Sequence, residues 1–85
     1  MPRHEDRSDR INNAALTYVW AQVADDIRAD IAAGTLRPGE RLPAEIDLAE
    51  MYGVARMTVR RAIADLTDKG EVVVVRGRGT YVAER

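Results

Sequence analysis

The sequence predicts a small α+β domain in which three helices precede a β-hairpin, and three observations lead to this fold class. Apolar residues recur every three or four positions in three segments before residue 69, which is the spacing of amphipathic helices. Four consecutive valines and a glycine-rich turn follow these segments, as in a hairpin. Because 85 residues bury one core only, all of these elements must share it.

The first helix is expected between Thr17, a candidate N-cap, and Gly34, a candidate C-cap. Its inner stripe comprises Leu16, Trp20, Val23, Ile27 and Ile31. Residues 1–15 lack such a stripe, so we expect them to form a flexible, solvated N-terminal arm. His4 lies in this arm, and because the chain has no second His and no Cys, no metal site is expected.

The second and third helices are expected to form a helix-turn-helix. Two prolines and a glycine after Gly34 predict a turn and an extended link, and a short helix then covers residues 44–52. Only "GVA" separates it from a third helix over residues 56–68. Two helices joined by a tight turn that contains glycine are typical of a helix-turn-helix. The third helix has an inner stripe of Val59, Ala62, Ile63 and Leu66.

The hairpin is expected over residues 71–83, with its tip at residues 76–79. A helix-turn-helix followed by a hairpin wing is a winged helix-turn-helix, which we therefore expect over residues 16–85. In such a domain the second helix of the pair reads the major groove of DNA, and the hairpin reaches the backbone or the minor groove.

Charge is distributed unevenly along the chain. The net charge is -1, but residues 1–50 hold six basic and ten acidic residues, whereas residues 51–85 hold seven basic and four acidic ones. Cations at the start of a helix oppose the helix dipole, so the arginines of the third helix indicate an anionic partner such as DNA phosphates. The candidate DNA-binding residues are Arg56, Met57, Thr58, Arg60, Arg61, Arg76, Gly77, Arg78, Gly79 and Thr80.

Other classes of function are disfavoured or remain as alternatives. No apolar run is long enough for a membrane helix or a signal peptide, so we expect a cytoplasmic protein without a membrane partner. No nucleophile and base occur together, and no phosphate-binding loop is present, so neither catalysis nor a cofactor is expected. A pI near 5.8 keeps open a protein-interaction module whose basic face docks an acidic partner. Arg60 and Arg61 also have a simpler interpretation as a solvated helix face paired with Asp65 or Asp68.

Four segments carry a resemblance to a known family: "WAQVADDIRADIAAGTL", "PGERLPAE", "LAEMYGVARMTVRRAI" and "GRGTYV". In order and spacing they resemble the N-terminal DNA-binding domain of the GntR family of bacterial transcriptional regulators, and "RMTVR" is similar to the HutC-type branch. The resemblance covers about residues 20–82. It implies sequence-specific binding of double-stranded DNA, usually as a repressor and as a homodimer on an inverted repeat.

Carried over position by position, the resemblance implies base or phosphate contacts for Arg56 and Arg60 and a phosphate contact for Thr58. It also implies an approach of Gly77 to the minor groove, with Arg78 beside it. The chain departs from the family at three positions: Ala44 and Ala55 replace serines that are common there, and Ile46 replaces a DNA-contacting arginine.

The largest departure from the family is length, because family members carry a C-terminal domain that binds an effector and supplies most of the dimer interface. No effector-binding domain is expected in these 85 residues. We expect dimerisation to use the N-terminal arm, the exposed side of residues 72–75 or the DNA itself. Alternate valines of a strand point away from the core, which makes the valine strand a candidate dimer surface.

Overall fold

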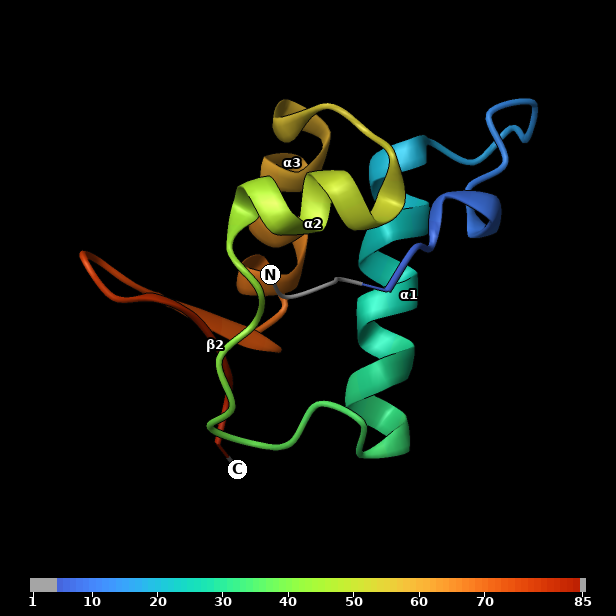
Figure 1. Cartoon of the computed structure of the whole chain (residues 1–85). Helices are drawn as coiled ribbons and strands as arrows, with labels where there is room; N and C mark the ends of the chain where they lie inside the picture. The colour runs from blue at the N-terminus through green and yellow to red at the C-terminus, as the bar shows by residue number, and fades with distance from the viewer. Residues whose placement is uncertain (1–4, 85) are drawn as a thin grey trace.

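The computed structural model describes residues 5–84 and contains the expected elements in the expected order (Figure 1). They are a short 3-10 helix η1 (Ser8–Arg10), the helices α1 (Val19–Ala33), α2 (Glu45–Tyr52) and α3 (Arg56–Asp68), and the strands β1 (Val72–Val75) and β2 (Gly79–Val82). The α+β winged helix-turn-helix prediction is thus confirmed.

One apolar core holds the domain together. α1 packs along α3, α2 packs across α3, and the base of the wing closes the core from the other side (Figure 1). Val59, Ala62 and Leu66 of α3 are buried as expected, while Ile63 is half-buried at the edge. The buried apolar residues are Val23, Ala24, Ile27, Leu42, Leu48, Ala49, Tyr52, Val59, Ala62, Leu66, Val72 and Val82.

The start of α1 differs from its expected position. The N-cap is Tyr18 rather than Thr17, and its side chain makes no capping hydrogen bond. Leu16, which was expected in the inner stripe, lies before the helix and is fully exposed. The periodic pattern was extended one turn too far toward the N-terminus, where no core surface faces it. Gly34 ends the helix in the left-handed conformation, as expected.

The turn between α2 and α3 depends on Gly53. Its φ of +64° lies in the left-handed region, and a Cβ added there would come within 3.0 Å of the Cβ of Ser8. The N-caps of α2 and α3 are Ala44 and Ala55, neither of which makes a side-chain capping hydrogen bond. Ala55 therefore lacks the side-chain cap that a serine at this position could supply. Because a serine cap is worth about 1 kcal/mol, packing must hold the start of α3 in place.

The wing is an antiparallel hairpin tied to the link between α1 and α2. Val72 lies opposite Val82 at its base, and the paired strands project away from the helices (Figure 1). Arg41 in the link forms an isolated bridge with Tyr81 on the other edge of β2, and the Val82 N–H donates to the Glu40 carbonyl at 2.8 Å. These bonds fix the direction of the wing relative to the helices.

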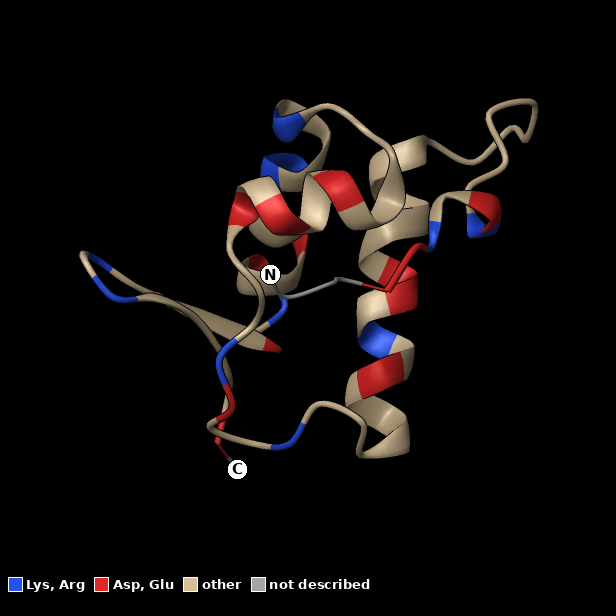
Figure 2. Cartoon of the chain, in the orientation of Figure 1, with Lys and Arg blue, Asp and Glu red and all other residues tan. Residues whose placement is uncertain are grey.

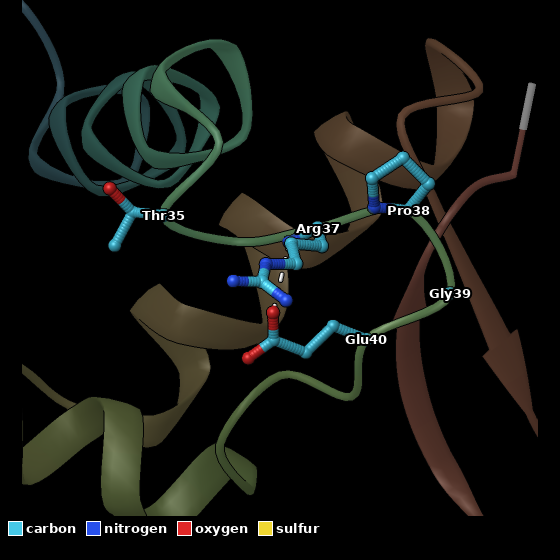
Figure 3. Close-up of a pocket in the computed structure, with 5 residues that line it drawn as sticks. All are labelled: Thr35, Arg37, Pro38, Gly39 and Glu40. Carbon is cyan, nitrogen blue, oxygen red and sulfur yellow. Dashed lines mark hydrogen bonds between the residues drawn. The ribbon is translucent and has the colours of Figure 1, made fainter.

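The link has a turn of its own. The Arg37 N–H donates to a carboxylate oxygen of Glu40 at 2.9 Å, and the Glu40 N–H donates back to the Arg37 carbonyl at 3.0 Å (Figure 3). A shallow, open pocket beside this turn is formed mainly by the bend of the chain itself, and its lining residues are Thr35, Arg37, Pro38, Gly39 and Glu40 (Figure 3).

Arg7 anchors the segment before α1 to the domain. The residue is only 7% exposed, and its Nη1 donates to Asp26 at 2.7 Å, to Asp30 at 2.7 Å and to the Tyr52 hydroxyl at 3.0 Å. The Tyr52 hydroxyl in turn donates to Asp26 at 2.6 Å. Burial raises the pKa of Asp26, but hydrogen bonds from Tyr52 and Arg10 outweigh it, so the pKa lies below its ordinary value. Burial and the bond to Asp26 raise the pKa of Tyr52.

This contact corrects part of the expectation for residues 1–15. A solvated arm does not describe Arg7, because the carboxylates of Asp26 and Asp30, four residues apart on one face of α1, need a cation between them. Residues 1–4, which include His4 and the start of the expected arm, lie outside the described residues.

Candidate nucleic-acid interface

α3 separates an apolar face from a basic one. Val59 and Leu66 are fully buried, which fixes the rotation of the helix about its axis. Arg56 and Arg60 consequently point away from the core, with side chains 60% and 59% exposed. Met57 beside them is 62% exposed although it is apolar. The first two turns of α3 therefore present a basic surface with an exposed thioether.

Glu45 at the start of α2 pairs with both exposed arginines. Arg60 donates from Nε to Oε2 and from Nη2 to Oε1, each at 2.9 Å, which is a bidentate pair. Arg56 donates from Nε to Oε1 at 3.2 Å. The hydrogen bond from Arg60 lowers the pKa of the Glu45 carboxyl, and the bond from Arg56 adds to this. The sequence pattern did not predict this pairing, because Glu45 lies in another helix.

The alternative interpretation paired Arg60 with Asp65 or Asp68 within α3. In the structure Arg60 pairs with Glu45 of α2 instead. Asp65 accepts hydrogen bonds from Arg28 of α1 at 3.1 Å and from Lys69 at 3.4 Å, so it is engaged on the core side of the helix. Arg28 also holds Glu71 at 2.7 Å, which joins α1 to the base of the wing.

Arg61 lies against an aromatic side chain. Its guanidinium carbon is 5.3 Å from the centre of the Trp20 ring, and Trp20 is itself stacked with Tyr18 at 6.1 Å. Arg61 is exposed, and within residues 5–84 it forms no salt bridge with an acidic side chain. Trp20 was expected in the core, but it is only half-buried and serves as a platform for Arg61. Thr58, on the first turn of α3, is half-buried.

The wing tip carries a second basic group. Arg76 and Arg78 are exposed on either side of Gly77, whose φ of +77° closes the turn. Within the part of the chain that the structure describes, neither arginine has an acid partner. The tip therefore offers two unneutralised guanidinium groups and a stretch of backbone without a side chain.

Arg41 of the link between α1 and α2 belongs to the same surface as the wing. A Cβ added to Gly79 would come within 2.6 Å of the Arg41 Nε, so the arginine lies directly against this glycine. The signal in the sequence was the glycine itself, because close approach of another group often requires one. Thr80 follows in β2 and is half-buried.

The structure therefore brings the candidate residues together as two groups. Figure 2 shows them apart, one at the N-terminal end of α3 and the other at the tip of the projecting wing. The acidic residues of α2 lie between them in this view. Among residues 5–84, no cluster of three or more His, Cys, Asp or Glu side chains is arranged to hold a metal ion. None of the helices within this range combines the length and apolar character needed to cross a membrane.

Comparison with known proteins identifies the family. Residues 20–82 match the model described as bacterial regulatory proteins, gntR family. The chain belongs to the GntR family. The matched GntR range is the one expected from the four sequence segments, which confirms the resemblance.

Individual GntR proteins are similar to the chain over most of its length. The mannosyl-D-glycerate transport/metabolism system repressor MngR of Escherichia coli (strain K12) is 44% identical over 66 residues, which are 78% of this chain and 28% of that protein. The histidine utilization repressor of Klebsiella aerogenes is 42% identical over 65 residues, or 76% and 27%. The chain thus spans less than a third of the length of these curated relatives. Their names describe regulators rather than enzymes.

Solved structures are similar in fold and in sequence. The structure of AraR(DBD) in complex with operator ORE1 superposes with a TM-score of 0.78 at 36% identity, covering 86% of this chain and 89% of that chain. These comparisons support DNA-binding regulation and do not favour a module that docks an acidic protein.

Proposed function

We propose that this domain binds a specific sequence of double-stranded DNA as the DNA-binding part of a transcriptional repressor. α3, residues 56–68, enters the major groove, and the wing, residues 71–83, contacts the backbone or the minor groove. The observation that carries the proposal is the orientation of α3, whose buried stripe turns Arg56, Met57 and Arg60 outward.

The side chains divide into two roles. Arg56 and Arg60 are suited to guanine, because a guanidinium donates two parallel hydrogen bonds to O6 and N7. Thr58 and Arg61 are suited to phosphates, as are the wing arginines. Gly77 and Gly79 allow the wing backbone to approach the duplex, with Thr80 as a further hydrogen-bonding group. The structure adds Arg41 to this wing surface because its side chain lies against Gly79.

The regulatory context rests on the relatives. MngR and the histidine utilization protein are named repressors, and AraR(DBD) is bound to an operator. By analogy, this domain acts on the bacterial chromosome in the cytoplasm, as a homodimer on an inverted repeat, and without catalysis.

Selection of bound sequences from random duplex DNA tests the proposal. The parent is expected to enrich one motif, and two mirrored halves within it would indicate a dimer. Repeating the selection with Arg56→Ala is expected to relax the preference at one guanine of the motif. No enrichment by the parent would overturn the proposal.

The dependence of binding on salt distinguishes the DNA reading from docking of an acidic protein. When a protein neutralises several phosphates, log K falls with log salt at a slope of about -0.9 per phosphate. A slope steeper than about -3 is therefore expected for the selected duplex. A flat dependence would contradict contacts with the backbone.

A further inference from the structure

Glu45 is an acidic side chain at the centre of the basic surface of α3. Its side chain is 28% exposed and lies between Arg56 and Arg60, both of which are more than half exposed. A carboxylate at this place opposes DNA phosphates and lowers the local positive charge. Simple attraction to DNA would be stronger without it, so its position calls for another physical role.

The geometry of the pairs shows which edge of each guanidinium is occupied. Arg60 uses Nε and Nη2 for Glu45, at 2.9 Å each. Arg56 uses the same edge, with Nε at 3.2 Å and Nη2 at 3.1 Å from Oε1. The Nη1 group of each arginine is not bound to Glu45, and that of Arg60 lies 3.6 Å from the Met57 sulfur. Each guanidinium therefore keeps an outer edge, formed by Nη1 and the second Nη2 proton, that Glu45 does not occupy. At Arg60 one Nη1 proton on this edge is shared with the Met57 sulfur.

From this arrangement we propose that Glu45 is a specificity-determining positioning residue, an inference that rests on the DNA-binding function proposed above. Glu45 holds the planes of Arg56 and Arg60 so that their outer edges face the bases. Because long side chains lose rotamer freedom on binding, an arginine that is already held loses less when it pairs with guanine.

The same carboxylate weakens binding to unrelated DNA. Binding of this kind depends on charge and not on the orientation of the guanidinium planes. Glu45 offsets one of the three positive charges that Arg56, Arg60 and Arg61 bring to the first two turns of α3, so a duplex without the correct bases is attracted less. Both effects raise the ratio of specific to non-specific affinity, one by supporting the correct contacts and the other by reducing the incorrect ones.

The experiment compares the parent with Glu45→Gln and with Glu50→Gln. Glu50 is exposed on the same helix, so the control makes the same change of charge away from the arginines. Affinity is measured for the duplex selected by the parent and for a scrambled duplex, at several salt concentrations. Glu45→Gln is expected to lower the ratio of the two affinities by about tenfold, near the lower range for one base contact. Glu50→Gln is expected to change both affinities alike.

A third variant separates position from charge. Glu45→Asp keeps the negative charge but withdraws the carboxylate by one methylene, so the ratio is expected to fall even though the salt slope is unchanged. Thermal unfolding of each variant confirms that it is folded. If Glu45→Gln and Glu50→Gln gave the same ratio of specific to non-specific affinity, the inference would be overturned. If Glu45→Asp kept the ratio of the parent, the positioning role would be overturned. A parent that prefers no sequence would instead refute the proposed function.

Discussion

Arg7 offers a sharp test of what stabilises the fold, because one buried cation faces two carboxylates. We predict that Arg7→Met destabilises the domain by about 2 kcal/mol. Loss of one partner from a fully buried ion pair costs about 3–5 kcal/mol. The cost is smaller here because Asp26 and Asp30 remain 20% and 18% exposed, and water partly restores their solvation. In a domain of this size, a loss of 2 kcal/mol lowers Tm by about 10 °C.

Thermal unfolding followed by circular dichroism at pH 7 measures this effect. The matched control is Arg10→Met, which removes another arginine that also contacts Asp26 but is 43% exposed. A much smaller loss is expected from it, because exposed ion pairs contribute little. Addition of Asp30→Asn to Arg7→Met is expected to recover part of the loss, since it removes one of two facing charges. If Arg7→Met and Arg10→Met unfold at the same temperature as the parent, the anchoring role of Arg7 is wrong.

Three further outcomes are expected. The pKa of Asp26 is lower in the folded protein than in the unfolded chain, so its contribution to stability is lost as the pH falls. Urea titrations from pH 6 to pH 3 should show the free energy of unfolding falling below about pH 4. Asp26→Asn should flatten that fall. Gly79→Ala should destabilise the wing by about 1–3 kcal/mol, because the φ of Gly79 is +137°. Adding Arg41→Ala should not restore the lost stability, since the strain lies in the backbone. Restored stability would instead place the cost in the contact with the Arg41 side chain. Trp20 is the single tryptophan and lies against Arg61, so its fluorescence should change when duplex DNA is added. Arg61→Ala should make the slope of log K against log salt shallower by about 0.9. An unchanged slope would place Arg61 away from the phosphates.

The helices and the wing could be predicted because their signals are local. The bounds of α3 agree with the sequence prediction, since a regular stripe lies between Gly53 and the last turn of the helix. The start of α1 was placed too early, because Leu16 continues the periodic pattern although no core surface lies opposite it. Periodicity gives the rotation of a helix but does not show where the neighbouring surface ends.

The polar contacts could not be predicted in the same way. Glu45 and Arg60 are 15 residues apart and belong to different helices, and Arg7 meets Tyr52 across 45 residues. Long charged side chains at exposed positions have many possible partners, and only the packing of the helices selects among them. The sequence therefore indicated which arginines face outward but not that Glu45 holds two of them.

Methylation of guanine N7 in the selected duplex tests most directly whether α3 reads the major groove, because N7 lies at the edge to which a guanidinium donates. We expect the parent to protect at least one guanine in each half of the motif, and Arg60→Ala to restore reactivity at one of them. Bound complexes in which every guanine N7 reacts as in free DNA would contradict this placement of α3.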